Sequence, residues 1–251
     1  MGLEIALMIV GALISIVGIY AFIVNVWLIV KYVRFNKIKN SAGLTGEEVA
    51  RKVLDANGLE HIKVKATGSL LFGNSYSHYF KKVRLRRMTR HKYSLTALGM
   101  GAQKASLAVL DKEGDPDMKK RIRLYPIIAG GPFMFIPLIS IGVALDYFVF
   151  NQSGIPTIIL GAIGFLFYAY AIVLSVLTLK TEKKAQAKAY EILGEKQLAT
   201  AEELDALKEL FHLYNVQYIN DIILASLELI YTALQILIAI KGGSSPNLSN
   251  D

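Results

Sequence analysis

Long apolar runs alternate with charged segments along this chain. Residues 5–30 contain no charged side chain, which is enough for a tilted helix to cross a hydrocarbon core of about 30 Å. Further apolar runs lie at 124–145, 147–179 and 222–240. The second and third runs meet at Asp146, and we expect a short turn at 151–156 between two helices, because Pro156 suits a first helical turn. The pattern predicts about four transmembrane helices.

The first apolar run also has to be compared with a cleaved signal peptide. Signal peptides carry basic residues in front of an apolar core of about 7–15 residues and end in a small-residue cleavage site. Here Glu4 precedes the run, the run is longer, and the basic residues begin behind it at Lys31. We therefore expect a membrane anchor.

The positions of Lys and Arg predict the orientation. The segment 31–123 holds most of the chain's 28 Lys and Arg residues, and the stretch after residue 179 is also basic. Basic loops stay on the cytoplasmic side, so 31–123 and 180–215 are expected there and both termini outside. The chain then divides into an anchor (1–33), a basic cytoplasmic insert (34–123), a transmembrane hairpin (124–179), cytoplasmic helices with a C-terminal membrane helix (180–241), and a disordered tail (242–251).

Local signals predict a mixed α and β insert. Thr45 and Glu48 form a capping box that starts a helix, and Ser94 is expected to cap another helix to about Leu110. Alternating stretches at 62–65 and 82–86 read as strands separated by a turn at Asn74-Ser75, and Thr200 to Glu203 is a second capping box. The fold class is thus a mainly α membrane protein with a cytoplasmic α+β insert.

Composition removes several kinds of chemistry. The chain has no cysteine, so thiolate metal sites, disulfides and cysteine nucleophiles are excluded. Its four histidines, His61, His78, His91 and His212, include no pair at helical spacing. The mean hydropathy of +0.41 agrees with a bilayer protein.

Two sequence stretches resemble a known family. They are Ser41-Ala42-Gly43-Leu44-Thr45-Gly46 and Leu54-Asp55-Ala56-Asn57-Gly58-Leu59, followed by Arg84-Leu85 and by Ala97-Leu98-Gly99 at a helix start. Together they resemble the YugP-type membrane zinc metallopeptidases over roughly residues 1–240. The resemblance implies a minimal zincin fold for the insert. It also implies an H-E-x-x-H motif, whose two histidines bind zinc and whose glutamate acts as general base.

The positions that the resemblance assigns to this motif carry other residues. Counted from Ala97-Leu98-Gly99, the histidine positions are Gln103 and Leu107, and the general-base position is Lys104. The remaining family ligand corresponds to Glu182, which is kept. Gln is a poor zinc ligand, Leu offers none, and a Lys ammonium repels a dication. We therefore expect no zinc, no catalytic residue and no other cofactor, and we interpret these positions as a vestigial metallopeptidase site.

The resulting hypothesis is a catalytically inactive peptidase homologue that binds or scaffolds a membrane-protein partner. One alternative is an active metallopeptidase with a non-standard zinc site assembled from His91, Glu182 and His212. Another is a structural subunit of a larger membrane complex. Homo-oligomers are compatible with the sequence.

Two further features suggest contacts. The densest basic cluster carries aromatic neighbours and is expected to meet lipid headgroups rather than nucleic acid, because it lies near membrane helices. It comprises Lys81, Lys82, Arg84, Arg86, Arg87 and Arg90. Glu228 is the one charge in the fourth apolar run and is a candidate intramembrane contact, although it shares a helix face with Asn220 and Asp221. Asp146 is expected at headgroup level.

Overall fold

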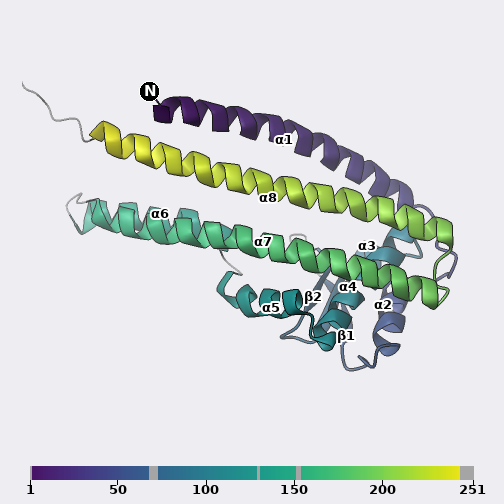
Figure 1. Cartoon of the computed structure of the whole chain (residues 1–251). Coiled ribbons are helices and arrows are strands. Elements are labelled where there is room, and N and C mark those ends of the chain that lie inside the picture. Colours follow the sequence, from purple (N-terminus) through teal and green to yellow (C-terminus); the bar gives the residue numbers. More distant parts are fainter. Residues whose placement is uncertain (1, 68–72, 129–130, 151–153, 244–251) are drawn as a thin grey trace, which may run out of the picture. The chain divides into compact units, whose positions relative to one another are not determined.

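The computed structural model describes residues 2–67, 73–128, 131–150 and 154–243. The predicted turn at 151–156 lies partly outside this range, and most of the predicted tail 242–251 lies outside it. The described residues form mainly helices (Figure 1). The elements are α1 Gly2–Phe35, α2 Gly46–Asp55, β1 Lys63–Thr67, β2 Ser75–Ser77, β3 Lys82–Arg86, α3 Arg87–Arg90, α4 Leu95–Glu113, α5 Pro116–Ile128, α6 Gly131–Phe148, α7 Ile155–Glu195 and α8 Ala201–Gly243.

The chain forms two compact units. The first, here called the membrane unit, comprises residues 1–23, 127–175 and 219–251. The second, here called the globular unit, comprises residues 24–126 and 176–218. The globular unit therefore contains the predicted insert together with the ends of α1, α7 and α8 that carry most of the charge.

Caps fix the helix starts of the globular unit. The Thr45 hydroxyl accepts a hydrogen bond from the backbone N–H of Glu48 (3.2 Å), and the Glu48 carboxylate accepts one from the N–H of Thr45 (2.7 Å). This confirms the predicted capping box. Ser94 likewise caps α4, and Thr200 and Glu203 form the box that begins α8.

Glycines allow α2 and α4 to touch backbone to backbone. A Cβ atom at Gly101 would overlap the carbonyl oxygen of Gly46, and a Cβ at Gly46 would overlap the carbonyl oxygen of Thr89. Gly99 leaves room for the side chains of Leu207 and Phe211 on α8. The small residues of α4 thus serve close helix packing, since any larger side chain would force the backbones apart.

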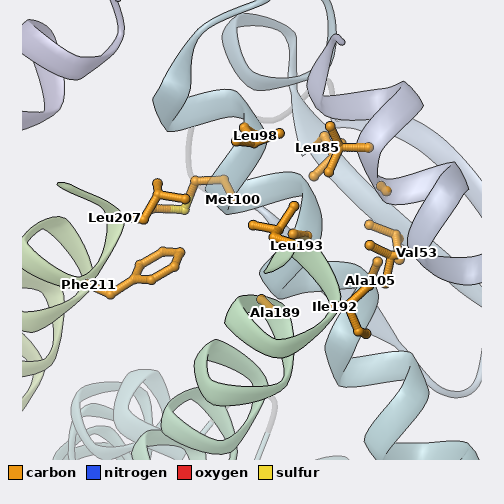
Figure 2. Packing of buried hydrophobic residues seen from close by; sticks show 14 of the residues in the cluster. Val53, Leu85, Leu98, Met100, Ala105, Ala189, Ile192, Leu193, Leu207 and Phe211 are labelled. Atoms are coloured by element: carbon orange, nitrogen blue, oxygen red, sulfur yellow. The ribbon is translucent and has the colours of Figure 1, made fainter. Parts of the chain in front are cut away.

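One apolar core joins α2, α4 and the sheet to the ends of α7 and α8. Figure 2 shows Leu207 and Phe211 beside Met100, with Leu193 between Phe211 and Val53. All of these side chains are buried. The apolar faces predicted from local periodicity therefore meet in a single core, and that core anchors the helix ends that carry the candidate site.

The sheet has the strand order β1-β3-β2. The two predicted strands, β1 and β3, are present and pair in parallel, while the three-residue β2 pairs antiparallel with β3. Asn74 stands directly before β2, where its side-chain oxygen accepts a hydrogen bond from the Arg86 N–H (2.7 Å). The residues expected to form only a turn therefore start an edge strand.

The Ser41 segment that carries the family resemblance has a structural role. The Ser41 backbone N–H and hydroxyl both donate to the Glu203 carboxylate, at 2.7 and 2.5 Å. The amide of Asn40 closes a turn by accepting from the Leu44 N–H (3.1 Å). These bonds join the loop before α2 to the start of α8.

Within the described residues, three helices are long and apolar enough to cross a membrane: α1, α7 and α8. The protein is therefore a multi-pass integral membrane protein. The helix expected over 124–145 corresponds to the end of α5 and most of α6, and residues 129–130 between them lie outside the described residues. The apolar helix Met134–Phe148 is shorter than the other three.

Helices α6 and α7 of the membrane unit are in contact. A Cβ at Gly142 would lie 2.7 Å from the Cα of Thr157, so the two helices touch there. The Asp146 carboxylate is buried and accepts hydrogen bonds from the Thr157 N–H (3.0 Å) and from the Thr157 hydroxyl. Asp146 thus joins α6 to the first turn of α7, and its headgroup-level position stays a prediction.

Candidate functional site

The middle of α4 presents Gln103 and Leu107 on one face, because residues four apart in a helix lie above one another. Both side chains are buried, and Lys104 lies beside them with 12% of its side chain exposed. The close backbone contact of α4 with α2 fixes this part of the helix. The positions that the resemblance assigns to H-E-x-x-H are therefore largely buried, on a helix that is held against α2.

Glu182 on α7 meets this face of α4. Its Oε2 accepts a hydrogen bond from the Gln103 amide (3.0 Å) and lies 2.7 Å from the Lys104 ammonium nitrogen. The structure therefore places Glu182 against the helix of Gln103 and Lys104. The structure brings together residues that are 78 and 79 positions apart in sequence.

Arg121 of α5 completes the network around Glu182. Its guanidinium donates to the Thr181 hydroxyl (2.7 Å) and lies 3.5 Å from Glu182 Oε1. Each carboxylate oxygen thus faces a different cation. We call Gln103, Lys104, Arg121 and Glu182 the polar network.

The two cations keep Glu182 ionised. Burial by itself raises the pKa of this carboxyl, but the charges of Lys104 and Arg121, with the hydrogen bonds they donate, lower it below its usual value. Glu182 follows Leu179, where the uncharged part of α7 ends, so the network lies outside the apolar stretch. The carboxylate is a paired anion rather than a free ligand.

Leu107, at the second histidine position, belongs to an apolar cluster. It packs with Leu110, Met118 and Ala185. Ala185 stands three residues after Glu182, so α7 covers this part of α4. Leu107 therefore fills the space in which a second imidazole ligand would lie.

The residues of the network do not fit a zinc ion. Structural and catalytic zinc sites use neutral imidazoles, carboxylates or thiolates, and catalytic sites take three protein ligands. Here one carboxylate is engaged by two cations, and an ammonium group stands where the family general base is expected. The described residues contain no group of three His, Asp or Glu side chains placed to hold a metal.

The histidines considered for a non-standard site are not part of the network. His91 and His212 are both exposed, and no hydrogen bond joins their side chains to Glu182 among the described residues. His78 does have a partner, since its Nδ1 lies 2.6 Å from the Asp111 carboxylate. The Tyr76 hydroxyl donates to the same carboxylate (2.6 Å).

Sequence patterns did not predict Arg121 or the Asp111 cluster. Arg121 lies in a basic stretch where nothing distinguishes it from its neighbours, so no local signal was available. For Asp111 a local signal did exist, because it continues the helical face of Gln103 and Leu107 at intervals of four.

A cleft of about 380 Å³ opens beside the polar network. Its described lining residues include two cations, Arg86 and Lys104, one carboxylate, Glu182, and several amides and tyrosines. The amide side chains of Gln186 and Asn215 form a reciprocal pair across it, at 3.0 and 2.8 Å. The substitution of the motif has therefore not closed the space next to it.

The predicted basic cluster is divided among several environments. Arg90 forms a bidentate pair with Glu47, at 2.7 Å for both bonds, and so serves the fold. Arg86 lines the cleft. Lys82 and Arg84 instead lie over the ring of Phe80, at 4.6 and 5.7 Å from its centroid. The cluster is thus not one continuous patch.

Glu228 lies in the apolar part of α8. Its carboxylate accepts a hydrogen bond from the Tyr168 hydroxyl of α7 (3.0 Å). Both residues line a small cavity of about 210 Å³ within the membrane unit. Glu228 therefore has a hydrogen-bond partner, Tyr168, on the neighbouring helix α7.

Comparisons with known proteins find a matching family model and a similar protein. A family model described as "Putative neutral zinc metallopeptidase" matches residues 8–237. The chain is 25% identical over 162 residues to "Putative membrane protease YugP" of Bacillus subtilis (strain 168), covering 64% of this chain and 66% of that protein, slightly under two thirds of its length. No solved structure matches. Since the model spans most of the sequence, this chain belongs to the neutral zinc metallopeptidase family.

Proposed function

We propose that this chain is a non-catalytic member of its family, in which a salt-bridge network replaces the zinc centre. The observation that carries the proposal is the 2.7 Å pair between Lys104 and Glu182. The ammonium group of Lys104 occupies the general-base position and gives the retained carboxylate the positive neighbour that a metal would otherwise provide. The network satisfies a buried carboxylate without any metal.

The same substitutions change the charge of the cleft. A zinc centre offers a dication to a ligand, whereas here Arg86 and Lys104 face the cleft with Glu182, and Arg121 adds another cation to that carboxylate. Cations outnumber anions, so the cleft favours a partner segment that presents a carboxylate over one that presents a basic side chain. The role we propose is to hold such a segment of a membrane-protein partner without cleaving it.

Chain connectivity supports a fourth membrane crossing through α6. Residue 126 and residue 176 belong to the same globular unit, while the apolar part of α7 lies between residues 155 and 179. If α7 crosses the membrane, the chain between residues 127 and 154 has to cross in the opposite direction. The 18 residues of α6 are about 27 Å long as a helix. We propose four crossings, with the basic globular unit in the cytoplasm.

Zinc binding tests the main proposal. The purified chain is equilibrated with zinc, freed from excess metal and analysed by mass spectrometry, and it is incubated with a mixture of peptides. We expect much less than one zinc per chain and no cleavage. Nearly one zinc per chain that is lost on His91→Ala or His212→Ala would instead support the alternative of a non-standard metallopeptidase site.

Peptide binding tests the proposed selectivity of the cleft. Fluorescent peptides that differ only in carrying Glu or Lys are titrated against the purified chain. We expect the acidic peptide to bind more tightly, and Arg86→Ala to remove the difference. Equal binding of both peptides, or no effect of Arg86→Ala, would contradict this part of the proposal.

The alternative of a structural subunit draws on a different observation. The Glu228 and Tyr168 pair lies in the apolar part of the membrane unit, where polar groups commonly join helices. Crosslinking in native membranes from a site next to Glu228 would favour this function if it captured one partner in fixed proportion and the cleft captured none.

A further inference from the structure

The turn between β2 and β3 exposes two aromatic side chains. Tyr79 is 55% and Phe80 is 67% exposed. Lys81 closes the turn in the left-handed region (φ 44°), and the Phe80 N–H donates to the Ser77 hydroxyl (3.4 Å). The turn thus has a defined conformation that presents apolar rings to the surroundings.

Two cations lie over the Phe80 ring. Lys82 and Arg84 pack over Phe80, as described above, and neither forms an ion pair in the part of the chain that the structure describes. Elsewhere in the globular unit most buried or half-buried cations have a carboxylate, for example Arg90 with Glu47. Among the described residues, Lys82 and Arg84 are therefore half-buried cations without a carboxylate, and both lie beside the exposed Phe80 ring.

The end of α5 extends this surface. The Tyr79 hydroxyl donates to the carbonyl oxygen of Ile122 (2.9 Å), and Tyr125 is 51% exposed. Phe80, Arg84 and Tyr125 line one groove of about 190 Å³. We call Tyr79, Phe80, Lys82, Arg84 and Tyr125 the aromatic-basic surface.

The aromatic-basic surface is preformed. His78, the residue before Tyr79, is tied to the Asp111 carboxylate on α4, and Tyr76 of β2 donates to the same carboxylate. These bonds hold the end of β2 against the buried α4. A ligand would therefore meet an ordered surface and would not have to order the turn on binding.

We propose that the aromatic-basic surface binds the anionic phospholipid headgroups of the membrane in which the protein sits. Aromatic rings favour the membrane interface, and Lys and Arg beside them are attracted to anionic lipid. Tyr125 also lies only six positions before the start of the apolar α6 at Gly131, so the surface is close in sequence to a segment proposed to cross the membrane. Nucleic acid is the other ligand that cations and exposed rings could bind, and the experiment below distinguishes it from lipid.

A single-tryptophan reporter tests this proposal in the full chain. The chain has one tryptophan, Trp27, so Phe80→Trp in a Trp27→Phe background reports on the turn alone and keeps an aromatic ring there. The protein is reconstituted in vesicles of phosphatidylcholine, with or without an equal part of phosphatidylglycerol. Quenching by acrylamide is measured, because this quencher is neutral and does not respond to the charge of the surface.

A matched reporter at Lys196 serves as control. Lys196 lies in the exposed connection between α7 and α8, about 24 Å of helix beyond Leu179. We expect the tryptophan at position 80 to be protected from acrylamide, with blue-shifted emission, only in vesicles that contain phosphatidylglycerol. The Lys196→Trp reporter should be quenched equally in both lipids.

Charge removal and salt complete the test. Combining Lys82→Gln with Arg84→Gln should lower the ratio of lipid-bound to unbound turn roughly 30-fold. Each cation near an anionic surface strengthens this binding equilibrium about fivefold. Lys52→Gln with Lys196→Gln removes the same charge elsewhere and should leave the quenching at position 80 unchanged.

Raising the salt concentration should also reverse the protection of position 80 from acrylamide. Quenching at position 80 that is the same in both lipids, or unaffected by the double variant, would overturn the proposal, as would protection by added RNA alone.

Discussion

The ammonium nitrogen of Lys104 lies 2.7 Å from the carboxylate of Glu182, and the amide of Gln103 donates to the same oxygen. Two adjacent residues of α4 thus bind one residue of α7 with the geometry of a charge-assisted hydrogen-bond pair. If this pair stands in for a metal centre, replacing its α4 members should restore metal binding. That expectation gives the first prediction.

The triple variant Gln103→His, Lys104→Glu, Leu107→His should bind zinc. Two imidazoles at positions four apart then face the Glu182 carboxylate, which loses its nearest cation. We expect nearly one zinc per chain by mass spectrometry, against much less for the parent. The variant Gln103→His, Leu107→His keeps Lys104 and serves as control. Equal zinc contents of parent and triple variant would show that Glu182 does not point at a former metal position.

Lys104→Met should destabilise the protein strongly. It leaves the Glu182 carboxylate, of which only 15% is exposed, with Arg121 as its remaining cation, and breaking a buried pair costs about 3 kcal/mol. Unfolding in detergent micelles measures the change. Adding Glu182→Met should recover part of the loss, because the unpaired charge is then gone.

An exposed pair provides the comparison for Lys104→Met. Lys208 and Asp205 lie 2.8 Å apart with most of both side chains exposed. Lys208→Met should cost less than about 0.5 kcal/mol. Similar losses for the two lysine variants would mean that the polar network contributes no more than a surface pair.

Acid should weaken the fold through Glu182. Its pKa is lower in the folded chain than the usual value of about 4.3, so the unfolded chain binds the proton more tightly. The stability from this group is fully present above that value and is lost as the pH falls through the folded pKa. Glu182→Gln should remove this part of the pH dependence. Parallel stability curves for parent and variant below pH 5 would contradict the assignment.

Single cysteines should report the topology, because the chain contains none of its own. Lys52→Cys and Lys196→Cys should react with a membrane-impermeant maleimide only after the cells are opened. Phe150→Cys, between α6 and α7, should react in intact cells. If α6 did not cross the membrane, Phe150→Cys would behave like the other two.

Gly101→Ala should separate α2 from α4. The new methyl would overlap the Gly46 carbonyl oxygen, and this backbone atom cannot move away by a rotamer change as a side chain can. Overpacking of this kind costs about 1–3 kcal/mol, measured by the unfolding midpoint. Gly18→Ala on α1, where a Cβ meets nothing within 4 Å, should be neutral or slightly stabilising. A Gly101→Ala protein as stable as Gly18→Ala would contradict the backbone contact.

Features that depend on near neighbours could be predicted from the sequence. The caps at Thr45, Ser94 and Thr200 each use a side chain three residues from its partner, so the signal is local. The strands β1 and β3 were also predicted, because their alternation is visible in five residues. In contrast, the three residues of β2 are too few to show a period.

Long-range pairs could be predicted only in part. The family resemblance linked Gln103 to Glu182, but nothing local distinguishes Arg121 from Lys119, Lys120 or Arg123, and its partner is 61 positions away. Hydropathy also did not predict the helix bounds within 124–145, where α5 ends at Ile128 and α6 begins at Gly131.

The continuity of α7 determines where the cleft can be reached. Glu182 follows Leu179, the last residue of the uncharged stretch, by three residues, which is about 4.5 Å along the helix. If the uncharged stretch of α7 crosses the bilayer as we propose, the polar network is expected near the lipid headgroups. A segment entering the cleft would then be delivered at that depth, as the stretch next to a transmembrane helix is, while a freely diffusing chain would first have to pass the headgroups.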